Sequence, residues 1–88
     1  MNKITAGDVR HFLTAKYSGA IKGIGLDPAA LGDDFDFLLS GVVDSFGILE
    51  MVSSIEQQFG IELDLGNLDA EQMTIHGPLS RYVAETAR

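Results

Sequence analysis

The sequence predicts a small all-α domain: a bundle of three main helices and one short helix, with a long loop between the first two main helices. Apolar residues recur at helical spacing in three separate stretches of the chain. Only residues 61–65 alternate between apolar and polar side chains, and no second such stretch exists to pair with them as a strand. The length of 88 residues predicts a single domain over residues 1–88.

The first helix is expected to begin after Thr5, whose hydroxyl suits an N-cap, with Asp8 in the first turn. Its inner face carries Val9, Phe12, Leu13 and Tyr17. Because Ser18-Gly19 and two later glycines weaken any continuation, we expect this helix to fray between residues 18 and 22.

A long connection leads from this helix to Asp44, with a capped turn predicted at Asp27-Pro28. Connections of this length are usually disordered or functional, and many apolar side chains argue against disorder. We therefore expect the apolar residues to pack over the core: Leu26, Leu31, Phe35, Phe37, Leu38, Leu39, Val42 and Val43.

The second main helix is predicted from Ser45 to Phe59, ended by Gly60. Its buried stripe consists of Ile48, Val52, Ile55 and Phe59, with Met51 beside it. A short helix is predicted from Asn67 to Met73. The last helix is expected to turn Leu79, Tyr82 and Val83 inward, and to begin at Pro78, which lacks an N–H.

Charge is unevenly distributed along the chain, whose net charge is −7. No Lys or Arg lies between positions 23 and 80, whereas that interval contains eleven acidic residues. The negative electrostatic field of these acids repels nucleic acid and attracts basic protein surfaces. An acidic face that only aids solubility has the same charge pattern. Nucleic-acid binding is therefore excluded from the expected functions.

The composition excludes several further kinds of site and of protein. The chain has no Cys, which removes disulfides and thiolate metal sites. It also has no apolar run long enough to span a membrane and no apolar leader after Lys3. We expect a cytoplasmic monomer.

The stretch GVVDSFGILEMV, residues 41–52, contains the main candidate site. Asp44 and Ser45 both suit an N-cap, but a helix needs only one, and capping remains an open explanation for Ser45. A hydrolase is not expected, because no Gly-x-Ser-x-Gly elbow surrounds Ser45, and His11 and His76 are expected at the surface or in caps. The acidic run Asp33, Asp34 and Asp36 lacks the Gly and distal Glu of a calcium loop. Covalent modification is the third explanation, since a helix N-terminus stabilises a phosphodiester.

The motif Gly41-Val42-Val43-Asp44-Ser45-Phe46, followed by Glu50, Glu56, Phe59 and Ile61, resembles the acyl carrier proteins. The resemblance extends from about Phe35 to Val83. It implies that a separate phosphopantetheinyl transferase attaches phosphopantetheine from coenzyme A to Ser45, with Asp44 in the recognition motif. The arm would hold acyl groups as thioesters for acyl-processing enzymes with basic docking surfaces. The protein itself would not be an enzyme.

The resemblance also makes the second main helix a docking helix. Its outward or edge residues would be Phe46, Leu49, Glu50, Ser53, Glu56 and Gln57. Phe46 and Leu49 would be apolar anchors for partner proteins, and Glu50 and Glu56 would contact Arg or Lys of the partner. An alternative is that Leu49 is partly buried and the acids are merely solvated.

Some positions depart from housekeeping fatty acid carriers, since Gly47, Ser53 and Gln57 stand where acids are usual. Asp-Ser-Phe-Gly is also similar to the Asp-Ser-Met-Gly of D-alanyl carriers, which are loaded by an adenylating ligase. We therefore expect a specialised carrier, with an aminoacyl, D-alanyl or peptidyl carrier as the alternative. Buried space for a fatty acyl chain would lie near Met51, Ile55, Leu68, Leu79 and Val83. An unmodified acidic protein-interaction module is the remaining alternative.

Overall fold

The computed structural model describes residues 3–64, 66, 69 and 73–87. These residues form helices and no named strand, which confirms the all-α prediction. The elements are α1 (Ala6–Lys16), α2 (Ser18–Gly23), the 3-10 helix η1 (Pro28–Ala30), α3 (Ser45–Phe59) and α5 (His76–Thr86). The short helix predicted over 67–73 lies outside the described residues, apart from positions 69 and 73.

Helix α1 begins with a capping box. The Asp8 N–H donates to Thr5 Oγ1 at 3.1 Å, and the Thr5 N–H donates to Asp8 Oδ2 at 3.0 Å. The helix ends at Lys16, and α2 follows after Tyr17, through the residues where fraying was expected. The fraying prediction is wrong because Ile21, at the centre of α2, is fully buried, and this burial outweighs the weak helix propensity of the glycines.

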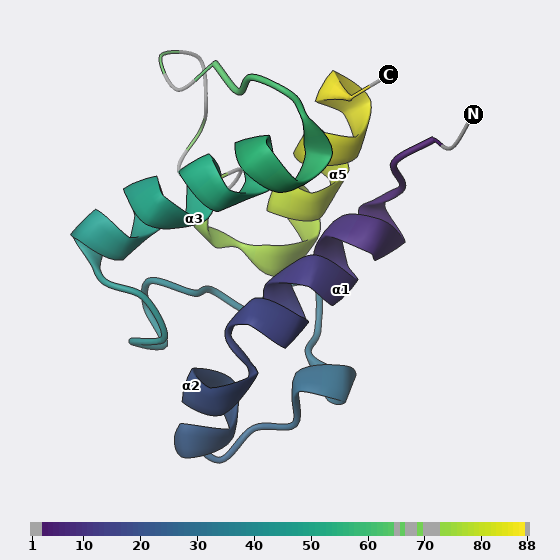
Figure 1. Ribbon diagram of the computed structural model, residues 1–88. Coiled ribbons are helices and arrows are strands. Elements are labelled where there is room, and N and C mark those ends of the chain that lie inside the picture. The colour runs from purple at the N-terminus through teal and green to yellow at the C-terminus, as the bar shows by residue number, and fades with distance from the viewer. Residues whose placement is uncertain (1–2, 65, 67–68, 70–72, 88) are drawn as a thin grey trace.

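The three main helices surround one apolar core (Figure 1). Helices α1 and α5 form the closest pair, and α3 runs across them. The rings of Phe12 on α1 and Phe59 on α3 meet edge to face, with centroids 5.6 Å apart. The fully or nearly buried apolar residues of the three helices are Val9, Leu13, Ile48, Met51, Val52, Ile55, Leu79, Val83 and Ala84.

The connection before α3 is fastened to the start of α5. The Phe37 N–H donates to the Thr74 carbonyl at 2.8 Å, and the His76 N–H donates to the Phe35 carbonyl at 2.8 Å. Phe37 is fully buried and Val43 nearly so, as the apolar composition predicts. The same prediction is wrong for the exposed residues Leu26, Leu38 and Leu39.

Helix α5 begins at His76, two residues before the predicted start at Pro78. Pro78 is the third helical residue, where an N–H would have no partner within the helix, so its absence does not break the helix. The N–H groups of His76 and Gly77 are satisfied by the connection, through the carbonyls of Phe35 and Asp33. Leu79 and Val83 are fully buried and Tyr82 is partly buried, in agreement with the predicted inner face.

His76 was expected at the surface or in a cap, and that expectation is wrong. Its side chain is 2% exposed and its ring packs edge to face on Phe37, with centroids 5.5 Å apart. The His76 Nδ1 atom has no hydrogen-bond partner among the described residues. Burial, assisted by the charge of Arg10, lowers the pKa of His76 to about 4.

This burial predicts a loss of stability in acid. The unfolded chain takes up a proton on His76 near pH 6.5, whereas the folded chain resists it down to about pH 4. The contribution is therefore complete above pH 6.5 and is lost as the pH falls to 4, by an amount on the order of 1 to 3 kcal/mol. Urea unfolding of wild type and His76→Gln across this range measures it, with His11→Gln as the exposed control. A His76→Gln variant with the wild-type pH profile contradicts the assignment.

Candidate functional site

Asp44 and Ser45 meet at the N-terminus of α3. Asp44 is the N-cap residue, and its Oδ1 accepts the Gly47 N–H at 2.7 Å. Ser45 is the first helical residue and is exposed, and its hydroxyl has no hydrogen-bond partner within the described part of the chain. Asp44 therefore does the capping, which leaves the Ser45 hydroxyl available for chemistry.

Two glycines and a valine build this junction. Gly41 has φ 83°, a left-handed conformation that side chains rarely adopt, and it turns the chain toward α3. Val43 is 7% exposed, and its N–H donates to the Phe37 carbonyl at 3.0 Å. A Cβ at Gly47 would lie 3.1 Å from Val43 Cβ and 3.2 Å from Asp44 Oδ1. A larger residue at position 47 would therefore press on the side chains of both Val43 and Asp44.

The junction has the chemical features that a phosphodiester on Ser45 needs. The hydroxyl is accessible, and α3 is a helix of fifteen residues whose N-terminal end favours negative charge. The cap occupies the Gly47 amide, while the amides of Ser45 and Phe46 have no acceptor among the described residues. These residues therefore fit a phosphopantetheine attached to the Ser45 Oγ.

Three apolar residues close to Ser45 in sequence are exposed. Phe46 is 85% exposed and Leu49 is 54% exposed. Leu39, which the sequence assigned to the core, is also 85% exposed. The run Phe37-Leu38-Leu39 could have indicated this exposure, because a tight turn does not direct three successive side chains inward. Phe37 is the residue of the run that occupies the core.

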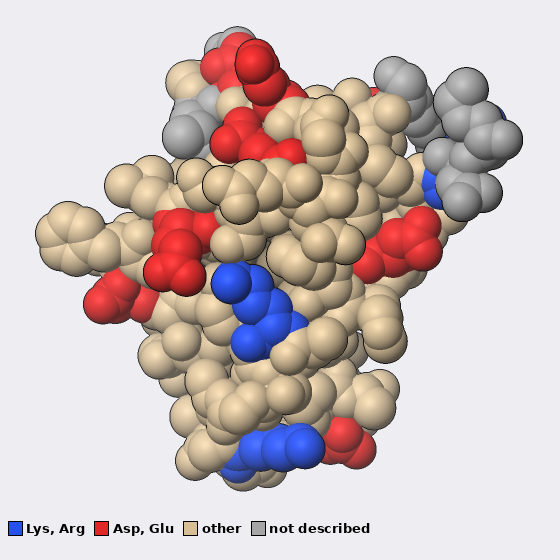
Figure 2. Space-filling view, in the orientation of Figure 1, with Lys and Arg blue, Asp and Glu red and all other residues tan. Residues whose placement is uncertain are grey.

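The acidic residues of α3 have different environments. Figure 2 shows acidic side chains over both ends of α3 and the segment after it. Glu50 is exposed, and its Oε1 lies 3.8 Å from Lys16 Nζ. Burial, together with the charge of Glu50, raises the pKa of Tyr17. Glu56 is only partly exposed, and its Oε2 accepts the Leu63 N–H at 2.8 Å, so it also holds the segment after α3 in place.

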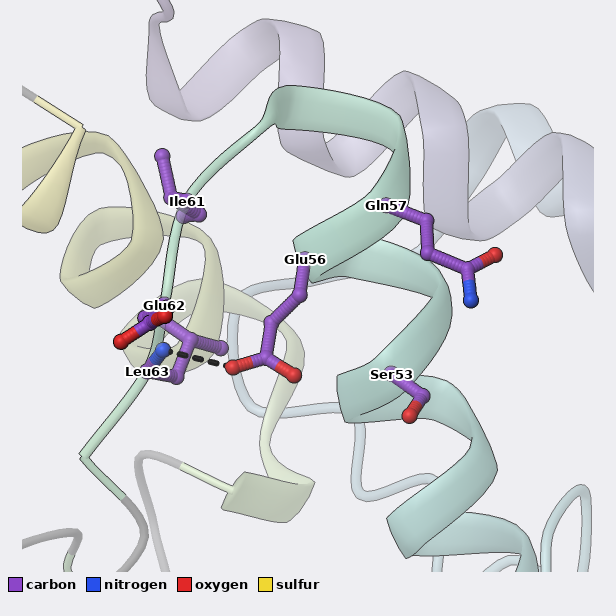
Figure 3. Close-up of a pocket in the computed structure, with 6 residues that line it drawn as sticks. All are labelled: Ser53, Glu56, Gln57, Ile61, Glu62 and Leu63. Carbon is purple, nitrogen blue, oxygen red and sulfur yellow. Dashed lines mark hydrogen bonds between the residues drawn. The ribbon is translucent and has the colours of Figure 1, made fainter.

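The remaining predicted positions, Ser53 and Gln57, are both exposed and lie beside Glu56 at a surface pocket (Figure 3). The pocket has a volume of about 380 Å³. Its lining residues are Ser53, Glu56, Gln57, Ile61, Glu62 and Leu63.

Other candidate chemistries lack support at this site. Asp33 pairs with Arg10 and Arg81, and Asp36 Oδ1 accepts the N–H groups of Leu38 and Leu39 at 2.9 Å each. Among residues 3–64, 66, 69 and 73–87, no three His, Cys, Asp or Glu side chains are grouped as a metal site. No helix in these ranges has the length and apolarity needed to cross a membrane.

Of the residues considered for a fatty acyl pocket, Met51, Ile55, Leu79 and Val83 are each fully buried in the core. Leu68 lies outside the described residues.

Comparison with known protein families matches residues 21–77 to the family described as "Phosphopantetheine attachment site". The match covers more than half of the chain and includes Asp44, Ser45 and most of the connection before them. No curated protein and no solved structure matches the chain.

Proposed function

The chain belongs to the phosphopantetheine attachment site family, whose members are carriers and not enzymes, and from this premise we propose that Ser45 bears the arm. The proposal rests on the different environments of two neighbouring residues at the start of α3. Asp44 caps the helix, and the neighbouring Ser45 hydroxyl stays exposed and unpartnered among the described residues.

Attachment takes place on a separate phosphopantetheinyl transferase. The Ser45 Oγ attacks the pyrophosphate of coenzyme A, forms a phosphodiester and releases adenosine 3′,5′-bisphosphate, while the hydroxyl proton passes to a base of the transferase. Once attached, the arm supplies a thiol that holds acyl groups as thioesters. Asp44 keeps Ser45 at the helix end and forms part of the surface that the transferase recognises.

Intact mass spectrometry tests the carrier function directly. Wild-type protein incubated with coenzyme A, Mg²⁺ and a promiscuous transferase should gain one phosphopantetheinyl group. A folded protein that gains none contradicts the proposal and favours the acidic interaction module.

We further propose that the chain serves a specialised pathway and is loaded by a dedicated ligase or transferase. Support comes from α3, where Gly47, Ser53 and Gln57 replace the usual acids and Lys16 lies against Glu50. An aminoacyl, D-alanyl or peptidyl carrier is the second candidate, favoured by the polar pocket beside Glu56. A panel of loading enzymes separates these cases, and efficient turnover with housekeeping malonyl transferase and ketosynthase rules out the specialised assignment.

Docking is proposed to use the exposed apolar residues Leu39, Phe46 and Leu49, with Glu50 facing a partner cation. Phe46→Ala should reduce kcat/KM for transfer from coenzyme A by about 5- to 30-fold, since a buried aromatic anchor contributes more than about 1 kcal/mol. Leu26→Ala, which truncates an exposed apolar residue beyond α2, is the control. Equal transfer rates for the two variants would exclude Phe46 as an anchor.

A further inference from the structure

The pocket beside Glu56 is lined by polar residues of α3 and by residues of the segment that follows. Ser53 and Glu56 are spaced i and i+3, so they share one face of the helix, whereas the Gln57 amide points away from the Glu56 carboxylate (Figure 3). Ile61 and Leu63 contribute apolar side chains from the segment that follows. Figure 3 shows the Glu62 carboxylate turned away from that of Glu56, so Glu56 is the carboxylate that serves the cavity.

Glu56 is fixed in position and is not paired with a cation. One carboxylate oxygen, Oε2, accepts the Leu63 N–H at 2.8 Å, and the other points toward the side of the cavity that carries Ser53 (Figure 3). Within the described ranges, no Lys, Arg or His lies within ion-pair distance of Glu56. A carboxylate that is already immobilised loses little further entropy when it binds a ligand.

The cavity lies along the path that an arm on Ser45 would follow. Glu56 is eleven residues beyond Ser45, which is close to three full turns, so both residues lie on one face of α3. The separation along the helix axis is about 16 Å. An extended phosphopantetheine chain is long enough to bring its terminal cargo to this point.

Tethering favours the cargo over a free ligand. A shallow surface site with a dissociation constant in the millimolar range retains no free metabolite at low concentration. A group on a flexible tether has an effective concentration that is also about millimolar, so the same site is occupied about half of the time.

We propose that Ser53 and Glu56 form a seat for the ammonium group of a small aminoacyl cargo carried on the Ser45 arm. This inference rests on the proposed function of Ser45. The Glu56 carboxylate accepts one ammonium N–H, the Ser53 hydroxyl accepts another, and Leu63 lies beside a short side chain. A fatty acyl group gains nothing from these two polar residues, so the seat selects for cationic cargo.

The test compares two cargoes that differ only in an ammonium in place of a methyl group. A promiscuous transferase loads the protein from amide-linked analogues of alanyl- and isobutyryl-coenzyme A, and intact mass confirms each product. Nitrogen-15 NMR then records the backbone amide shifts. The alanyl form should shift the amides of Ser53, Gln57 and Leu63 relative to the isobutyryl form.

Variants and salt identify the source of these shifts. Glu56→Gln, whose amide oxygen still accepts the Leu63 N–H, should reduce the alanyl-specific shifts by about fivefold or more, since a charge-assisted hydrogen bond is lost. Glu85→Gln removes the same charge from exposed α5 and should leave them unchanged. In the wild type, about 1 M salt should also weaken them, without any substitution.

Identical amide shifts for the two cargoes would contradict the proposed ammonium seat while leaving the proposed carrier function intact. Alanyl-specific shifts that survive Glu56→Gln and high salt overturn it as well. A protein that accepts neither arm by intact mass contradicts the proposed function itself, and the seat is then rejected with it.

Discussion

Ser45→Ala is expected to abolish phosphopantetheine attachment completely while leaving the fold intact. No other atom at the start of α3 replaces the lost Oγ as a nucleophile, because the neighbouring Asp44 carboxylate is engaged with the Gly47 N–H. The helix keeps its cap, so the free energy of unfolding should stay within about 0.5 kcal/mol of wild type. Intact mass after incubation with transferase, together with urea unfolding, measures both quantities.

Ser54→Ala is the matched control for this experiment, because Ser54 lies on the same helix and loses the same hydroxyl. It should be modified at the wild-type rate. Attachment that persists in Ser45→Ala would move the site to another residue, and a large loss of stability would mean that Ser45 has a structural role.

Phe37→Ala is expected to have the largest effect on stability, about 3 to 5 kcal/mol. The Phe37 ring is fully buried and meets Phe35 and His76 edge to face, with centroids 5.1 Å and 5.5 Å away. For a domain of this size, that loss is a large part of the roughly 4 to 13 kcal/mol that holds it folded. Since the Phe37 backbone also bonds Thr74 and Val43, the variant should be modified slowly at temperatures where it begins to unfold.

Urea unfolding with Leu39→Ala as the control measures this effect. Leu39 lies two residues away on the same turn but is 85% exposed, so its truncation should cost less than about 0.5 kcal/mol. If the two variants are equally stable, Phe37 is not the anchor of the connection.

Local sequence was sufficient to predict the start and end of α3. The Asp-Ser pair, the apolar stripe at helical spacing and Gly60 all act within one or two turns of helix. Both Asp44 and Ser45 suited the cap, however, and only the geometry selects Asp44. The sequence therefore predicted that Ser45 lies at the start of α3. It did not predict that the Ser45 hydroxyl makes no capping hydrogen bond.

The errors arose where contacts between distant segments override local preference. His76 is buried because Phe37, thirty-nine positions earlier, packs against its ring. Helix α5 starts at His76 because the carbonyls of Phe35 and Asp33 accept its first N–H groups. Leu39 is exposed because Phe37 occupies the core position in the same turn. None of these pairings has a periodic signal in the sequence.

The exposure of the proposed docking residues was predicted in part. Phe46 and Leu49 are exposed, as the helical pattern indicated, but the roles of Glu50 and Glu56 depend on neighbours that the pattern does not show. Lys16 lies against Glu50, and the Leu63 N–H fixes Glu56. These contacts suggest different uses for the two acids: partner docking for Glu50 and cargo binding for Glu56.

Fragmentation mass spectrometry of the loaded wild-type protein locates the phosphopantetheine arm that we propose for Ser45. The added mass should be found on Ser45 alone, in fragments that separate it from Ser40 and Ser53. An added mass on either of those serines, or on any other residue, would contradict the proposal.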